Sequence, residues 1–211
     1  MQKLVKFLLW TAGIIAILLL IARLSGLRLW TIPKDPFLGA SVAPTVFAGD
    51  LVVVMTSGQR GANELVRCVD PDDSQRWVMG RIYGQSGDTM SVLGSSVSVN
   101  GRRYATTEAC VDDEVLVNDP VSGAPKKLRC ARVEFAGGWH FIASGETRDT
   151  SPAEHRVGAG RFYLVSDNRA YHEDSRDFGA VNADTCTDRV LFRLWGTEGF
   201  MGSKRRFEFV R

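Results

Sequence analysis

The chain has 211 residues, enough for one well-packed domain, or for one domain with a membrane anchor. Its 26 lysine and arginine residues nearly balance its 24 aspartate and glutamate residues, which gives a formal net charge of +2. This balance argues against a dominant nucleic-acid interface, which normally needs a clustered basic surface. We therefore expect no nucleic acid among the partners of this protein.

The first predicted element is an N-terminal membrane-spanning helix. Residues 7–22 carry no charged side chain, and residues 4–24 would extend about 31 Å as a helix, enough to cross a bilayer core. Lys3 and Lys6 precede the apolar stretch, which favours a cytoplasmic N-terminus and export of the rest of the chain. A cleaved signal peptide has a similar layout, but no convincing small-x-small cleavage site follows. We predict an uncleaved anchor over residues 1–27.

Short strand patterns dominate the remainder, residues 28–211. Residues 51–55 (LVVVM) form an apolar run between turn residues, as expected of a buried strand. Residues 76–83 predict another strand, and Asn100-Gly101 suits the positive φ angles of a tight hairpin turn. Strand patterns at 161–165 and 189–195 complete the set. We therefore predict a mainly β, antiparallel fold for the exported domain.

A hydrophilic segment at residues 106–159 is predicted to be an insertion in this β core. The four cysteines lie in and around it, and none are spaced as CxxC, so we expect neither a metal site nor a cofactor. An even number of cysteines is compatible with two disulfides in an oxidising compartment. We favour Cys110–Cys130, which would join the ends of part of the insertion, and leave Cys68–Cys186 open. The alternative is that all four cysteines are reduced.

Three motifs in the β region carry the chemistry. They read SVAPTVFAGD at residues 41–50, GRIYGQSGD at 80–88 and SDNRAYHEDSRDFG at 166–179. In this order, after an N-terminal span, they resemble the bacterial signal peptidase I family, whose patterns are SMxPTLxxGD, KRxxGxPGD and GDNRxxSxDSRxxG. The third motif is the most specific, because DNR, DSR and the final glycine keep the family spacing. The resemblance covers residues 38–195, with residues 106–159 weakly matched.

The resemblance implies a membrane-bound serine endopeptidase on the outer face of the cytoplasmic membrane. Its implied task is to remove signal peptides from exported preproteins as they leave the translocon. Such enzymes cleave after small residues of a substrate held as an extended strand, a mode in which main-chain hydrogen bonds give affinity. The implied partners are therefore signal peptides, the lipid bilayer and the secretion translocon. A self-cleaving repressor on a related scaffold is disfavoured by the N-terminal span.

By the same resemblance, Ser41 matches the nucleophile, whereas the position of the general-base lysine falls on Gly80. Glycine cannot accept a proton, and the neighbouring Arg81 stays protonated. Lys126 and Lys127 lie in the insertion and Lys204 lies beyond the last predicted strand, with no motif to place any of them near Ser41. A serine hydroxyl is a weak nucleophile unless a neighbouring base takes its proton. The departure therefore predicts either a replacement base or a catalytically inactive homologue.

His172 is the candidate replacement base. It occupies the position of the family serine that hydrogen-bonds the lysine, and Gly80 would leave space for its ring. An imidazole is a competent base near neutral pH, and Glu173 or Asp174 could orient it as a carboxylate does in a catalytic triad. The alternative is an inactive homologue that binds signal peptides or an active paralogue. His140 and His155 match no motif position and are predicted to be structural or surface residues.

The predicted site thus has a catalytic group formed by Ser41, His172 and Asp174. Gly39 falls where some family members carry a hydroxyl that helps to bind the oxyanion, so the oxyanion would depend on backbone N–H groups here. The residues predicted to bind substrate or to support the site are Gly39, Ala40, Pro44, Gly80, Arg81, Asp167, Asn168, Arg169, Ser175 and Arg176.

Overall fold

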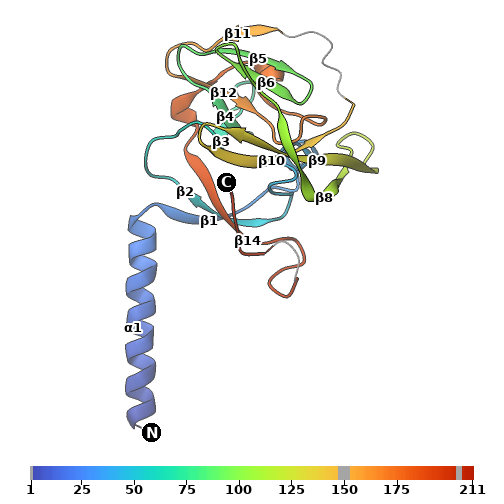
Figure 1. Ribbon diagram of the computed structural model, residues 1–211. Helices are drawn as coiled ribbons and strands as arrows, with labels where there is room; N and C mark the ends of the chain where they lie inside the picture. The colour runs from blue at the N-terminus through green and yellow to red at the C-terminus, as the bar shows by residue number, and fades with distance from the viewer. Residues whose placement is uncertain (1, 147–152, 203–205) are drawn as a thin grey trace.

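The computed structural model describes residues 2–146, 153–202 and 206–211 (Figure 1). The helix α1 (Gln2–Leu24) projects away from a β-rich domain, and its apolar side chains are exposed along its length. Within it, Gln2–Ile21 is long and apolar enough to cross a membrane. The uncharged, almost entirely apolar stretch between Lys6 and Arg23 is stable in lipid rather than in water. It is consistent with a single-pass membrane anchor.

The rest of the chain folds mainly into antiparallel β-sheet, which confirms the predicted fold class. The strands are β1 (Leu27–Thr31), β2 (Leu51–Met55), β3 (Leu65–Val69), β4 (Trp77–Gly84), β5 (Thr89–Leu93), β6 (Ser96–Val99), β7 (Arg102–Tyr104), β8 (Thr106–Asn118), β9 (Pro125–Phe135), β10 (Gly138–Ser144), β11 (Glu154–Arg156), β12 (Arg161–Val165), β13 (Val181–Asn182), β14 (Asp188–Trp195) and β15 (Glu208–Phe209). Three short helices join them: α2 (Pro36–Ser41), α3 (Ser175–Phe178) and the 3₁₀ helix η1 (Ala183–Thr185).

The main sheet has the strand order β1-β2-β14-β3-β4-β12-β13, with β15 paired to β14. Val52 and Val54 of β2 alternate with half-buried neighbours and pack in the core with Leu38 and Val42, which lie in and just after α2. This period of two is what a strand with one buried face requires. The core therefore places α2 directly beside the central strands of the sheet.

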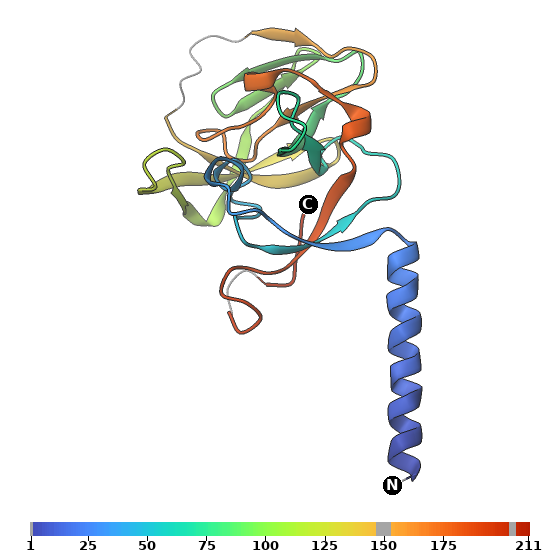
Figure 2. The ribbon, with the colours of Figure 1, turned by 180° about the vertical axis from the view of Figure 1, so that it is seen from behind.

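Two smaller sheets complete the domain. The first has the order β11-β5-β6-β7, and its β6–β7 hairpin turns at Asn100 and Gly101, which have φ angles of 51° and 78°. The second has the order β10-β9-β8 and lies against α2, which is drawn in blue beside these strands in Figure 2. Its long strands β8 and β9 arise from the hydrophilic segment at residues 106–159. The segment therefore contributes a sheet that covers α2.

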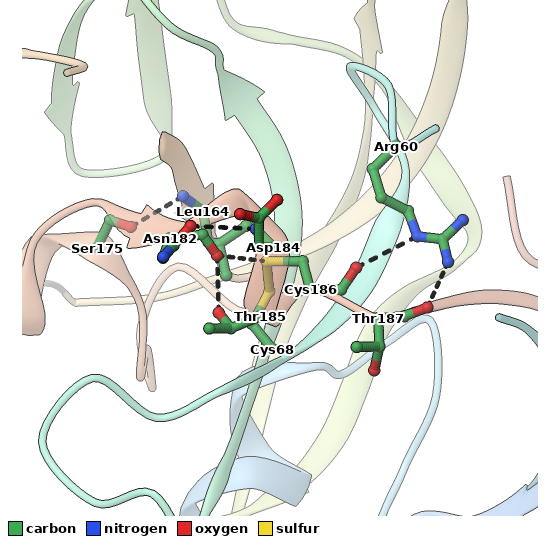
Figure 3. Close-up of a disulfide and its surroundings, with 9 residues drawn as sticks. All are labelled: Arg60, Cys68, Leu164, Ser175, Asn182, Asp184, Thr185, Cys186 and Thr187. Atoms are coloured by element: carbon green, nitrogen blue, oxygen red, sulfur yellow. Dashed lines mark hydrogen bonds between the residues drawn. A yellow bond between two sulfur atoms is a disulfide. The ribbon is translucent and has the colours of Figure 1, made fainter. Parts of the chain in front are cut away.

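Both disulfides are formed. Cys110 and Cys130 join β8 to β9, which confirms the favoured pairing, and Cys68 and Cys186 join β3 to the residue after η1 (Figure 3). Cys110 lies where the β8–β9 register shifts between Ala109 and Glu114, so this bond crosses an irregular part of the ladder. Cys68–Cys186 closes a far longer loop and fixes the connection between β13 and β14 against the centre of the main sheet.

Candidate functional site

Ser41 is the last residue of α2. The helix begins after Asp35, whose carboxylate accepts hydrogen bonds from the backbone N–H groups of Phe37 and Leu38. Pro36 follows at the first helical position, where its fixed φ angle suits a helix start. The helix packs between the main sheet and the β8–β10 sheet, so the side chain of Ser41 is fully buried.

The hydroxyl of Ser41 is engaged with its own helix. Its Oγ lies 2.9 Å from the backbone oxygen of Leu38, to which it donates a hydrogen bond. Within the described part of the chain, this bond goes to a carbonyl and not to a titratable side chain. The backbone oxygen of Ser41 accepts a hydrogen bond from the N–H of Asn168, and Asn168 Nδ2 donates to Ala40 O, both at 2.9 Å. The first and third motifs therefore meet at Ser41, through main-chain groups.

Gly80 lies in β4, opposite Val66 of β3. A Cβ atom on Gly80 would sit 3.0 Å from Leu164 Cβ and 3.5 Å from backbone atoms of Val165. The space beside Gly80, which we expected to accommodate the ring of His172, is therefore filled by β12. A side chain at this position would require Leu164 to shift slightly, because its Cβ would be in tighter contact than side-chain carbons normally are.

Arg81 joins the second motif to the third through a buried ion pair. Its Nε donates to Asp167 Oδ1 at 2.7 Å, and its Nη1 donates to the backbone oxygen of Asn63 at 2.8 Å. Thr45 of the first motif donates its hydroxyl to the other carboxylate oxygen of Asp167. Both charged side chains are almost fully buried, so the pair is stable only because hydrogen bonds satisfy its polar atoms. All three motifs are thus anchored at Asp167.

His172 lies in the loop before α3 and retains 17% of its side-chain exposure. Its Nδ1 lies 2.9 Å from Asp177 Oδ2, and since a carboxylate can only accept, Nδ1 is the donor. The structure thus gives the orienting contact to Asp177, a residue that sequence reasoning had not assigned to this role. Glu173, one of the two carboxylates considered for it, instead accepts a hydrogen bond from Arg76.

Asp174, the other carboxylate considered, caps α3. It accepts hydrogen bonds from the N–H groups of Ser166 and Arg176 and from the guanidinium of Arg176. Complete burial would raise the pKa of this carboxyl, but Arg176, His172 and the Ser166 N–H outweigh burial and lower it to about 2. Asp174 lies close to His172 and Asp177, with potential ligand atoms within 4.8 Å of one another. Because Arg176 and backbone N–H groups already bind its oxygens, Asp174 serves the loop as a structural anion.

Ser175 and Arg169 also have structural contacts. Ser175 Oγ accepts the N–H of Leu164 at 2.9 Å, which ties α3 to β12 next to Gly80 (Figure 3). Arg169 is buried, and its Nη2 donates to the hydroxyl of Tyr83 at 2.9 Å. The third motif therefore organises the core around the site, whatever chemistry the site performs.

His140 belongs to the same buried network. Its Nε2 lies 2.9 Å from the hydroxyl of Tyr83 and 3.9 Å from Asp167 Oδ1. Burial, together with the positive charges of Arg81 and Arg169, lowers its pKa well below the usual value. The prediction of a structural role fits these contacts, but the link to Asp167 carried no signal in the sequence, because His140 is distant from every motif.

Gly39 and Pro44 shape the backbone around Ser41. A Cβ on Gly39 would lie 2.7 Å from Ala48 Cβ, so this position admits no hydroxyl-bearing side chain while α2 packs against the 47–49 loop. The peptide bond between Ala43 and Pro44 is cis. The absence of a side chain at Gly39 is therefore explained by packing.

The comparisons with known proteins agree with the three motifs. The family described as "Signal peptidase, peptidase S26", whose members are typically serine endopeptidases, matches residues 5–195. The chain is also similar to proteins named "Signal peptidase IB" from Staphylococcus aureus strains Mu50, N315 and MW2. Each is 24% identical over 162 residues, which cover 74% of this chain and 74% of the relative. The family match spans the anchor and nearly all of the β domain. The chain therefore belongs to the S26 signal peptidase family.

Proposed function

We propose that this protein binds the signal peptides of exported polypeptides at the outer face of the cytoplasmic membrane, without cleaving them through serine–lysine chemistry. One observation carries the proposal. Ser41 Oγ donates its hydrogen bond to Leu38 O, and the position of the family's lysine base is occupied by Gly80, which packs against Leu164. Among the described residues the hydroxyl of Ser41 bonds to a carbonyl rather than to a base, and a serine without a base is a poor nucleophile. Membership of the family supports the choice of ligand, because the family acts on signal peptides.

The edge of β4 offers a place for an extended peptide. Along Trp77–Arg81 one edge of β4 is paired with β3, whereas on the opposite edge β12 pairs only with Arg81, Ile82 and Gly84. Among the described residues, Trp77, Val78 and Met79 therefore have no strand partner on this second edge, although Val78 and Met79 are buried in the structure and β12 covers Gly80. A signal peptide would add a strand there, with main-chain hydrogen bonds supplying affinity. The helix α2 packs beside this edge and would have to shift to admit the peptide.

Binding and cleavage should be measured separately on the full chain, reconstituted in lipid nanodiscs. We expect a fluorescent signal peptide to bind wild type and Ser41→Ala with equal affinity, and neither protein to cleave it. A peptide N-methylated at alternate residues should bind about tenfold more weakly, because it lacks main-chain donors. Cleavage that disappears in Ser41→Ala would overturn the proposal.

A second candidate function is peptide cleavage with His172 as the base. The 2.9 Å contact between His172 Nδ1 and Asp177 Oδ2 favours it, because such a carboxylate fixes the tautomer in which Nδ1 carries the proton and Nε2 is the basic nitrogen. Hydrogen bonds of catalytic groups are often long in a structure without substrate. If His172 is the base, we expect the wild type to cleave the peptide and both Ser41→Ala and His172→Ala to lose this cleavage. Cleavage retained by His172→Ala would rule out this base.

A further inference from the structure

A cleft of about 520 Å³ opens on the side of α2 that faces the β8–β9 hairpin. Its walls come from four parts of the chain: α2 with its cap, residues 47–50, the end of β8 with the following turn, and the loop after β14. This volume lies within the range of pockets that hold small ligands. The cleft touches Gly39 and Ala40, which directly precede Ser41.

The floor of the cleft is apolar and offers little side-chain bulk. Ala40 and Val117 are buried in one cluster that also contacts Phe47. Glycines at positions 39, 123, 196 and 199 also line the cleft, so the main chain of a ligand can approach closely there. At the rim, the side chain of Leu116 remains 61% exposed. These features suit an extended peptide segment.

The charges around the cleft favour a cationic ligand. Asp35, Asp50, Asp119 and Glu198 line it, and no lysine, arginine or histidine is among the described lining residues. Arg193 lies 3.5 Å from Asp50 and offsets that charge, and Lys34 lies beside Gly49 near the edge. The remaining balance is negative, and a cleft with low-dielectric walls concentrates such a field.

Asp119 keeps its charge and its position. Its carboxylate accepts hydrogen bonds from the N–H groups of Val121 and Ser122 and from the hydroxyl of Tyr171. The two backbone N–H groups lower the pKa of this carboxyl, so it stays ionised at neutral pH. The hairpin turn therefore presents a fixed anion towards the cleft, and the lining residues that the structure describes include no cation to neutralise it.

We infer that this cleft binds a lysine- or arginine-containing segment of the polypeptide whose signal peptide binds at the β4 edge. The inference rests on the proposed function for the identity of that polypeptide. The apolar floor takes the main chain and the small or aliphatic side chains, and the rim carboxylates pair with the basic side chains. The β4 edge would recognise main-chain groups of the polypeptide, and the cleft would add a preference for basic side chains.

The test uses labelled pentapeptides of alternating alanine and lysine, or of alanine and glutamate, with the full chain in nanodiscs of zwitterionic lipid. We expect the lysine peptide to bind at least about tenfold more tightly than the glutamate peptide, with affinity falling as salt rises. Leu116→Lys should weaken binding of the lysine peptide about tenfold, because it places a cation at the rim. Val121→Lys, an exposed position in the same hairpin outside the cleft lining, is the matched control and should change binding less than about twofold.

Two results would overturn the inference: equal affinity for the two pentapeptides, or equal effects of Leu116→Lys and Val121→Lys. A signal peptide without basic residues tests the proposed function in parallel, and Leu116→Lys should leave its affinity unchanged. If that peptide binds while the lysine peptide shows no preference, the cleft inference fails alone. If the lysine peptide binds in a Leu116-sensitive manner while the signal peptide does not bind, the proposed function fails and the cationic selectivity of the cleft stands.

Discussion

Asp174 is a buried anion on which the third motif depends. Its pKa is lowered from 3.8 to about 2, so its charge stabilises the folded state at pH values above 3.8. We predict that Asp174→Asn lowers the free energy of unfolding at pH 7 by about 3 kcal/mol, since Arg176 loses its partner. As the pH falls from 4 towards 2, Asp174 becomes protonated in the wild type. The difference in free energy of unfolding between wild type and Asp174→Asn therefore decreases by about 2 kcal/mol.

Urea unfolding of both proteins at several pH values measures this gap. Asp184→Asn, at an exposed position in η1, is the control and should change stability by less than about 0.5 kcal/mol. A gap between wild type and Asp174→Asn that stays constant down to pH 2.5 would show that the carboxylate of Asp174 does not carry the stabilisation.

His140 gives the domain a second dependence on pH. Arg81, Arg169 and Asp167 are the charged groups that face it, and its pKa is lowered, so it is neutral in the fold. The unfolded chain takes up a proton below a pH of about 6.5, so stability is complete above this value and decreases below it. We predict that wild type loses up to about 1.4 kcal/mol per pH unit more than His140→Phe as the pH falls from 6.5 to 5. Parallel pH profiles for the two proteins would contradict this.

The candidate site was only partly predictable at the level of residues. The motifs placed Ser41 and Asn168 in one predicted site, and in the structure the N–H of Asn168, in the loop between β12 and α3, donates to the backbone oxygen of Ser41. Asp177 was missed as the partner of His172, although an aspartate three residues after Asp174 is the pattern of a capping box. His140 could not have been found, because its contacts depend on how the insertion folds back on the core.

At the level of elements, the closure of β12 over Gly80 can be tested directly. We predict that Gly80→Ala lowers the free energy of unfolding by about 1–3 kcal/mol, because the new Cβ would lie 3.0 Å from Leu164 Cβ. Gly61→Ala is the matched control: its Cβ would lie 3.9 Å from Glu64, and its φ angle is not positive. Thermal unfolding followed by circular dichroism compares the two. Equal effects would show that β12 yields easily, and that the lysine position is not closed by packing.

Strands that coincide with short apolar runs were predictable, and those within the hydrophilic segment at residues 106–159 were not. The bounds of β2 and β12 agree with the apolar runs at 51–55 and 161–165. The strand β8 is mostly exposed and carries acidic and threonine side chains, so it shows little alternation to detect. The strand β9 does bury Leu128, Cys130, Val133 and Phe135, but charged residues between them mask the pattern. The pairing of β8 with β9 depends on the whole hairpin rather than on a local sequence pattern in either strand. The helix α2 was also missed, although Asp35 followed by Pro36 is a readable start signal.

At the scale of the whole molecule, the two disulfides should contribute unequally. Cys68–Cys186 spans 118 residues and Cys110–Cys130 spans 20, and the loss of chain entropy on cross-linking grows with loop length. We predict that replacing Cys68 and Cys186 by alanine lowers the free energy of unfolding by about 5 kcal/mol, against about 3 kcal/mol for the other pair. Denaturant unfolding of the two double variants measures the order. A larger loss from the short loop would show that local strain, rather than chain entropy, sets the contribution.

The burial of Ser41 also determines how this protein would respond to covalent serine inhibitors. A reagent that labels serine hydrolases needs an accessible hydroxyl whose proton is already shared with a base. Ser41 has no exposed surface, and its proton is committed to a backbone carbonyl. Inhibitors aimed at reactive serines would therefore leave this protein unmodified, and its abundance in a membrane preparation would be invisible to activity-based profiling. The proposed binding of signal peptides would thus persist while reactive serine peptidases in the same membrane were blocked.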